Sequence, residues 1–340
     1  MNPLLAHLLE AAARAPSAHN TQPWVLSWHE DELRLRLDRE RMLPAADPEG
    51  SDAVHALGTA IENLLLTLSQ LGLEGQYSVT ATCESKPAVI LRWRKRDGPM
   101  PDPSLYRMIP IRSTVRLRYF REPIPGAVLD DIVRAAQSPS RLYVLTDERA
   151  IDEIRSLAAL ASRRLLENEN HARELYRWLR FSRRHADWYR DGLNSESMGW
   201  NAITSAVCRH LLKPAAVRML ARLHLSRWLY GNLNQQAPFA PALCLLTASD
   251  VTFRGRVDAG RNLQRTWLTA AKHGLVTHPL SAAVDYAQFR PRVFQLFGVA
   301  EGEVHVNLFR LGRSGKTPRS PRLTADELLE PATDPLGRLA

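Results

Sequence analysis

The amino-acid sequence predicts an α+β protein in which two related halves share one chain and the second half carries a helical insert. Segments with the helical spacing of apolar residues alternate with short strand-like segments along the 340 residues. Two pairs of similar segments recur in the same order. The distance between the paired segments is 79 residues longer in the second half, which indicates an insertion there.

The first half, which we place at residues 1–100, begins with a helix that Pro16 ends, because proline disfavours the α conformation at the residue before it. Leucine and arginine alternate over 33–37, which predicts a strand with one buried face. Gly72 ends a longer helix. The elements that we expect are a helix over 3–14, a hairpin of strands over 25–28 and 33–37, a helix over 52–71 and a buried strand over 87–93.

A linker rich in proline and glycine covers 97–103, and the second half follows at 104–340. Residues 148–233 are rich in arginine and tryptophan and are predicted to be almost wholly helical, with the insert at about 150–233. From Gly312 the composition predicts an extended tail. The other expected elements are a helix over 126–136, a strand over 141–146, a strand over 241–247, a helix over 258–273 and a strand near 304–311.

Internal repeats favour the duplication of one structural unit. Residues 12–17 read AARAPS and residues 135–140 read AAQSPS. Residues 58–73 (GTAIENLLLTLSQLGL) and 260–275 (GRNLQRTWLTAAKHGL) match at five positions in register. Helices rich in alanine and leucine can resemble each other by chance, but two matches in the same order favour duplication.

The composition limits the classes of function. The net charge of +9 rests on arginine, since only five of the 45 basic residues are lysine, and acidic residues alternate with the arginines, which disfavours a nucleic-acid partner. Cys83, Cys208 and Cys244 are far apart, which disfavours disulfides and metal sites and favours the cytoplasm. No apolar run reaches the roughly 20 residues of a membrane span, and the first residues show no secretory signal, so we expect no membrane partner.

The most specific motif joins the first helix to the first strand. Residues 15–24 read APSAHNTQPW and offer a hydroxyl, amide side chains and backbone N–H groups, which suit a polar planar ring. This stretch resembles the A-P-S-x-x-N-x-Q-P-W signature of the nitroreductase family, the FMN-dependent α+β oxidoreductases. His19 lies inside the motif, where it either contacts the ligand or only caps a turn.

A second motif, RSTVR at 112–116, places a hydroxyl between Arg112 and Arg116. Two guanidinium groups and a hydroxyl can bind a phosphate through charge-assisted hydrogen bonds. A solvated pair of arginines is the alternative. The stretch resembles the family's R-R-S-x-R motif, which binds the FMN phosphate. Ser113 stands where the family has its second arginine, so one phosphate contact is weakened or lost.

Two further stretches resemble parts of the family's flavin site. Residues 274–281 (GLVTHPLS) resemble the segment whose backbone approaches flavin N5. Arg319 and Arg322 resemble the C-terminal basic residues that complete the phosphate site, although arginines in a tail are usually just solvated. The resemblance implies an FMN site formed by Pro16, Ser17, Ala18, His19, Asn20, Gln22, Arg112, Ser113, Thr114, Arg116, Pro279, Leu280, Ser281, Arg319 and Arg322.

The order of the motifs is unusual. In ordinary family members the arginine motif precedes the Q-P-W motif, and each FMN site of the homodimer takes one motif from each subunit. Here only the second half has the arginine motif, and only the first half has the loop of residues 18–24. The chain resembles the two-domain, Acg-type branch of the family, in which one chain mimics the dimer. This implies a nitroreductase-like fold with one FMN per chain, shared by the halves.

The resemblance implies an enzyme that transfers hydride from NADH or NADPH through FMN to a small nitro- or quinone-like acceptor, as a monomer or homodimer. The flavin carries the redox chemistry, so we name no catalytic side chain. The alternative is a non-catalytic flavin-binding or storage protein whose insert closes over the flavin as a lid. A nucleic-acid binder without flavin is a third class.

Overall fold

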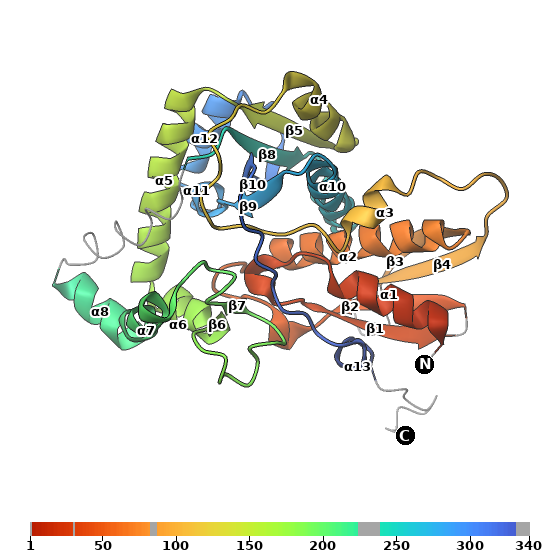
Figure 1. Cartoon of the computed structure of the whole chain (residues 1–340), viewed down its shortest axis with the longest axis horizontal. Coiled ribbons are helices and arrows are strands. Elements are labelled where there is room, and N and C mark those ends of the chain that lie inside the picture. The colour runs from red at the N-terminus through yellow and green to blue at the C-terminus, as the bar shows by residue number, and fades with distance from the viewer. Residues whose placement is uncertain (1, 30, 82–86, 224–238, 331–340) are drawn as a thin grey trace.

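The computed structural model describes residues 2–29, 31–81, 87–223 and 239–330, and these contain two four-stranded antiparallel sheets (Figure 1). The strand orders are β1-β2-β4-β3 and β5-β8-β10-β9, so both sheets have the same topology. The predicted α+β class is confirmed. The strands are β1 (Trp24–His29), β2 (Glu32–Leu37), β3 (Leu73–Ala81), β4 (Pro87–Lys95), β5 (Ser140–Leu145), β8 (Ala242–Ala248), β9 (Val276–Pro279) and β10 (Val304–Gly312).

Two long helices lie against each other between the sheets. These are α2 (Ser51–Gln70) and α10 (Phe253–Lys272), and Gly58 and Gly260 lie where the two helices approach most closely. Helix α1 (Pro3–Ala13) packs on α2, and α4 (Gly126–Ala135) packs on α10. Each half therefore contributes a sheet, an outer helix and one helix of the central pair.

Apolar alternation fixes how each sheet is covered. Every residue of β8 is buried, because Cys244 and Leu246 face the helices α4 and α10 while Leu243 and Leu245 face the opposite layer. That layer consists of α5 (Glu148–Glu167), α11 (Ala282–Asp285) and α12 (Arg290–Phe297). The first sheet instead buries one face against α1 and α2, as its alternating leucines predict.

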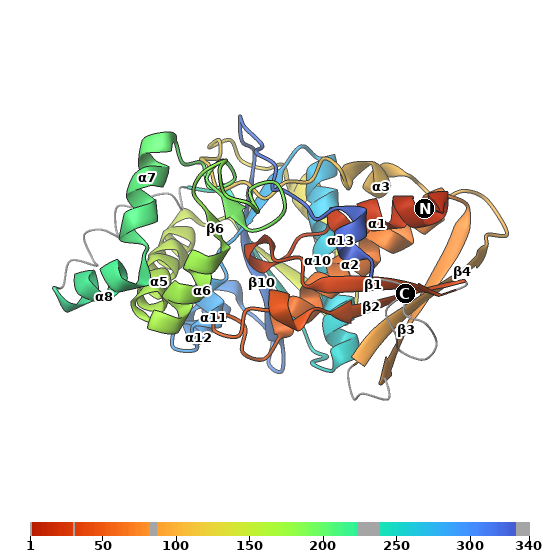
Figure 2. The same cartoon turned by 90° about the horizontal axis from the view of Figure 1, so that it is seen from below.

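The insert is less helical than we predict. It contains α5, α6 (Glu169–Trp178), α7 (Ala202–Leu211) and α8 (Pro214–Arg222), which lie at one end of the molecule (Figure 2). Residues 179–201 contain turns and the short strands β6 (Leu179–Arg180) and β7 (Leu193–Asn194) instead. Gly192 and Gly199 adopt φ angles of +73° and +72°, which interrupt a helix. Part of the predicted stretch, 224–233, lies outside the described residues.

The chain returns from the second half to the first near its C-terminus (Figure 1). Residues 313–324 carry no helix or strand, as predicted, but the short helix α13 (Ala325–Leu328) follows. Leu323 and Leu328 are buried in the core of the first half, and the amide of Glu330 donates to the carbonyl of Leu26 at 2.8 Å. Two strands of the four-stranded sheets, β3 and β9, are not predicted by the sequence patterns.

Within the described part of the chain, none of the helices combines the length and apolar character that crossing a membrane requires.

Candidate functional site

A cavity of about 510 Å³ lies where the two halves and the insert meet. Fourteen of the fifteen predicted ligand-binding residues line it, although they come from four separate stretches of sequence. The exception is Gln22. The lining residues that we predicted are Pro16, Ser17, Ala18, His19, Asn20, Arg112, Ser113, Thr114, Arg116, Pro279, Leu280, Ser281, Arg319 and Arg322.

The loop after α1 has an unusual backbone. His19, Asn20 and Gln22 adopt positive φ angles of 47°, 55° and 52°, which cost energy for residues with a Cβ. The hydroxyl of Ser17 accepts from the amide of Gln22 at 2.8 Å, and Thr59 of α2 donates to the carbonyl of Pro16 at 2.9 Å. These contacts hold the strained loop against the central helix.

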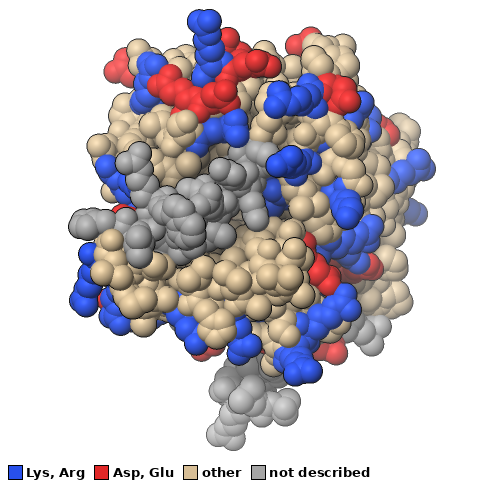
Figure 3. Space-filling model, turned by 60° about the vertical axis from the view of Figure 1, so that its left-hand side comes forward, with Lys and Arg blue, Asp and Glu red and all other residues tan. Residues whose placement is uncertain are grey.

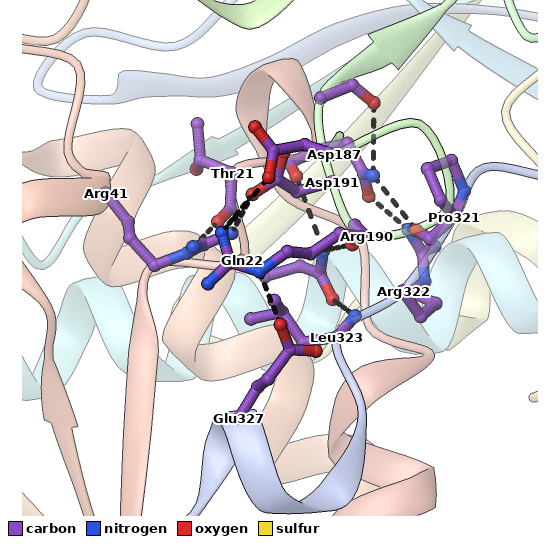
Figure 4. Close-up of polar contacts among 12 residues, drawn as sticks. Thr21, Gln22, Arg41, Asp187, Arg190, Asp191, Pro321, Arg322, Leu323 and Glu327 are labelled. Carbon is purple, nitrogen blue, oxygen red and sulfur yellow. Dashed lines mark hydrogen bonds and ion pairs between the residues drawn. The ribbon is translucent and has the colours of Figure 1, made fainter. Parts of the chain in front are cut away.

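Asn20 and Gln22 connect their loop to the insert and to the tail, and Figure 4 shows Gln22 beside Arg190 and Leu323. The amide of Asn20 donates to the carbonyls of Gly192 in the insert (3.2 Å) and Pro321 in the tail (3.0 Å). Gln22 is fully buried, donates to the carbonyl of Arg190 at 3.2 Å and accepts from the amide of Leu323 at 2.9 Å. Because these backbone groups use both ends of its amide, Gln22 holds the insert and the tail in place instead of lining the cavity.

His19 faces the cavity from this loop. The pKa of its imidazole is lowered to about 4, first by burial and then by the nearby Arg116 and His171. The ring is therefore neutral at pH 7, and its Nδ1 is buried without a hydrogen-bond partner.

The arginine motif lies beside β9. Thr114 and Thr277 form a parallel bridge, and the amide of Val115 donates to the carbonyl of Thr277 at 2.9 Å. This pairing brings together two motifs that are some 160 residues apart in the sequence. The hydroxyl of Ser113 donates to the carbonyl of Pro318 at 2.6 Å and so binds the tail.

The arginines form a cationic wall without acidic partners. Among the residues that the structure describes, no carboxylate forms an ion pair with Arg112, Arg116 or Arg322. Arg112 Nε and Arg116 Nη1 are buried without a hydrogen-bond partner. Burial is the largest cause that lowers the pKa of Arg112 and Arg116 to about 10 and that of Arg322 to about 9, so all three remain cationic at pH 7. Buried cations of this kind suit an anionic ligand.

Strand β9 and helix α11 line the cavity next to the arginine motif. The amide of Leu280 is occupied by the carbonyl of Leu308 at 2.7 Å, and Pro279 has no N–H. Within 279–281, this leaves the backbone amide of Ser281 as the donor that could reach a ligand. Asn307 donates to the hydroxyl of Ser281 at 3.3 Å, and its own Oδ1 is buried and unpartnered.

Sequence reasoning missed the part of the cavity that α2 contributes. Asp52, His55, Ala56 and Thr59 line the cavity at positions i, i+3, i+4 and i+7, so they share one face of the helix. Polar residues at this spacing in an otherwise apolar helix are the signal that could have revealed them. Burial, followed by His305 and Arg256, lowers the pKa of His55 to about 3. Burial and the neighbouring Asp285 raise the pKa of Asp52 well above its usual range.

The insert closes the cavity with a mostly apolar wall. His171 is one of the few polar side chains there, and burial lowers its pKa. Asp191 of the insert is 2% exposed and accepts from Arg41 of the first half at 2.7 Å, which ties the insert to that half (Figure 4). Asp191 also accepts from Arg180, within the insert, at 2.6 Å. The insert residues on the wall are Ala158, Ala159, Ser162, Leu165, Leu166, His171, Leu175, Leu179, Leu193, Met198, Trp200 and Leu212.

The fold and the cavity define a class: an α+β protein with two sheets of the same strand order and a cavity that has a cationic wall and an apolar one. A protein named "Putative NAD(P)H nitroreductase Rv3131" from Mycobacterium tuberculosis (strain ATCC 25618 / H37Rv) is 29% identical over 336 residues, which cover 95% of this chain and 90% of that protein. The chain is therefore similar, over nearly its whole length, to a protein named as a putative nitroreductase, as its motifs predict.

A second relative is "Uncharacterized protein MT1398" from Mycobacterium tuberculosis (strain CDC 1551 / Oshkosh), which is 28% identical over 287 residues and 83% of this chain. The chain spans only 39% of the length of that protein. Among solved structures, the FMN and NADPH-dependent nitroreductase NfnB from sphigopyxis sp. strain HMH matches with 19% identity and a TM-score of 0.40, over 66% of this chain and 97% of that one. No family model matches the chain.

Proposed function

We propose that this protein is an FMN-dependent oxidoreductase of the nitroreductase type, which passes hydride from NADH or NADPH through the flavin to a small acceptor. The observation that carries the proposal is the convergence of fourteen predicted FMN-binding residues on one cavity. The full-length relative named for NAD(P)H nitroreductase activity supports the same conclusion. That the present protein is cytoplasmic stays a prediction.

The residues present fit FMN. A cavity of about 510 Å³ is within the roughly 300–1,000 Å³ of small-molecule sites. Arg112, Arg116 and Arg322 would hold the phosphate, since their positive charges have no acidic partner among the described residues. The strained loop at 17–20 and the segment 279–281 would hold the ring. When bound, the flavin supplies the redox chemistry, and the chain binds, orients and shields it.

We propose that residues 1–100 and 104–340 are two copies of one unit and that they share a single FMN. The identical strand order of the sheets supports the duplication. The cavity takes its strained loop from the first copy and its arginine motif from the second. Each motif occurs once, so we expect one site.

The cavity wall favours an uncharged, apolar acceptor, such as a nitroaromatic or a quinone. The insert contributes leucine, methionine and tryptophan side chains to the cavity wall, and an ionised group against them would lose its hydration without gaining a partner.

The second candidate is a flavin-binding or storage protein that does not turn over. The buried ion pair between Asp191 and Arg41 favours it, because this pair fixes the insert to the first half. A permanently closed insert would act as a lid and exclude the hydride donor. A nucleic-acid interface has less support, because acidic side chains lie among the basic ones on the face in Figure 3. Carboxylates also pair with several arginines, as Glu169 does with Arg173 and Arg218.

The absorbance spectrum of the purified protein, recorded without oxygen before and after addition of NADH or NADPH, tests the proposal. A flavin band that bleaches supports the oxidoreductase. A flavin band that persists supports storage. No band, even after reconstitution with FMN, refutes both.

A further inference from the structure

Beneath the cavity wall, Arg310 of β10 is paired with His278 of β9. The two residues lie directly opposite each other in the antiparallel register. Arg310 is fully buried, and its Nε and Nη2 lie 3.2 and 2.9 Å from Nδ1 of His278. The same guanidinium also donates to the carbonyls of Val115 and Leu117 and lies 4.3 Å from the ring centre of Tyr119.

This contact determines where His278 carries its proton. A guanidinium has five N–H donors and no acceptor, so Nδ1 of His278 must be the acceptor. In the neutral ring the proton then lies on Nε2. A second proton on Nδ1 would face the Arg310 donors. Burial, followed by Arg310 and Arg116, accordingly lowers the pKa of His278 well below its usual value.

The position of the ring leaves this N–H for a ligand. His278 lines the cavity, whereas Arg310 does not, so Arg310 holds the ring from behind. His278 directly precedes 279–281, and Arg116 is a neighbouring charge on the same wall. Among the described residues, Arg310 and Arg116 are the charged groups that act on the ring, and Tyr119 and Arg155 act in turn on Arg310.

We propose that His278 donates a hydrogen bond from Nε2 to an electron-rich oxygen or nitrogen of the ligand ring, and that Arg310 is the positioning residue that fixes this donor. The proposal rests on the proposed function, which places FMN in this cavity. Because the ring stays neutral at pH 7, it supplies a hydrogen bond and keeps its proton. Such a bond strengthens as electron density on the bound flavin grows, so it favours the reduced over the oxidised cofactor.

The first arm of the test uses flavin-free protein. Side-chain ¹⁵N spectra of the histidines distinguish Nε2–H, Nδ1–H and doubly protonated rings, and the signal lost in His278→Gln identifies this residue. We expect a neutral Nε2–H ring at pH 8 and still at pH 6.5, where an unperturbed imidazole would be about half protonated. In Arg310→Gln, checked for folding by circular dichroism, the His278 ring should no longer be restricted to the Nε2–H form, since glutamine can either donate to Nδ1 or accept from it. A ring that is Nδ1–H, or that titrates near pH 6.5 in the native protein, would overturn the proposal.

The second arm compares the affinities for oxidised and reduced FMN through the midpoint potential of bound FMN. His278→Phe should weaken the binding of reduced FMN relative to oxidised FMN by about tenfold, which is about 30 mV for a two-electron couple. His278→Gln, which keeps an N–H donor, should recover part of the lost preference for reduced FMN. His273→Phe is the matched control, because His273 pairs with Asp131 and does not line the cavity. An unchanged potential in His278→Phe overturns this proposal alone, whereas absence of FMN binding to the native protein overturns the proposed function with it.

Discussion

Gly260 of α10 lies against the backbone of His55 in α2: a Cβ built on Gly260 would be 2.0 Å from the carbonyl oxygen of His55. The converse holds at Gly58, where a Cβ would be 2.2 Å from the carbonyl oxygen of Val257. The two glycines occupy equivalent positions in the repeated segments, and His55 also lines the cavity. The helix crossing thus sets both the distance between the halves and the shape of the site.

Gly260→Ala should destabilise the protein by about 1–3 kcal/mol or more, because the added methyl group meets rigid backbone. The urea midpoint of unfolding measures the loss, and FMN binding should weaken in parallel as the halves move apart. Gly126→Ala is the matched control: nothing lies within 4 Å of its added Cβ, so the substitution should be neutral or slightly stabilising. Equal midpoints for the two variants would contradict the close approach.

Asp191→Ala should destabilise the protein by about 3–5 kcal/mol, because it leaves the largely buried guanidinium of Arg41 without its carboxylate and the buried one of Arg180 with only the more distant Asp187, at 3.8 Å. The insert should then detach from the first half, and limited proteolysis should cut residues 179–201 faster. In Glu196→Ala the lost pair with Arg183 is solvent-exposed, so a change of only about 0–1 kcal/mol is expected. Cleavage of 179–201 at the native rate in Asp191→Ala would show that this carboxylate does not anchor the insert.

Arg116→Ala should weaken FMN binding by about tenfold to a hundredfold, since a charge-assisted hydrogen bond contributes roughly 1.5–3 kcal/mol. Riboflavin, which lacks the phosphate, should bind both proteins equally. The flavin-free variant should be no less stable than the native protein, because the substitution removes a cation with a buried, unpartnered Nη1. The exposed Arg118→Ala is the control. An equal loss of riboflavin affinity would place Arg116 away from the phosphate.

The low pKa of the partly buried His19 should make stability depend on pH. Its pKa is about 4 in the folded protein and about 6.5 in an unfolded chain, so the unfolded chain binds the proton first as the pH falls. The free energy of unfolding should therefore fall by about 1.4 kcal/mol per pH unit between pH 6.5 and 4 on account of this residue. His19→Asn should remove that contribution, and asparagine tolerates the positive φ. Urea titrations at pH 7 and 5 measure how the free energy of unfolding changes with pH, and His7→Asn, at an exposed position, is the control. The same pH dependence in His19→Asn as in the native protein would refute this prediction.

Local sequence patterns predict the parts of this protein whose form depends on neighbours in the chain. The helix ended by Gly72, the hairpin with alternating leucines and the loop with its hydroxyl and amides all have local causes. The arginine pair could be assigned only beside the first motif, because two arginines alone are usually solvated.

Contacts between distant segments explain what the sequence did not predict. Gln22 holds Arg190 and Leu323, and no pattern near Gln22 indicates either partner. Strand β9 has only four residues and depends on pairing with β10, which begins some 25 residues later. The polar face of α2 becomes part of a site only because α10 and the insert enclose it.

The amount of FMN released per chain tests the central claim most directly, namely that the halves share one flavin. After reconstitution and removal of free flavin, the account predicts one FMN per chain. Asn20→Ala in the first half and Arg116→Ala in the second should each reduce that same occupancy, because Asn20 and Arg116 line one cavity. Two flavins per chain, or variants that each leave a different flavin bound, would contradict the account.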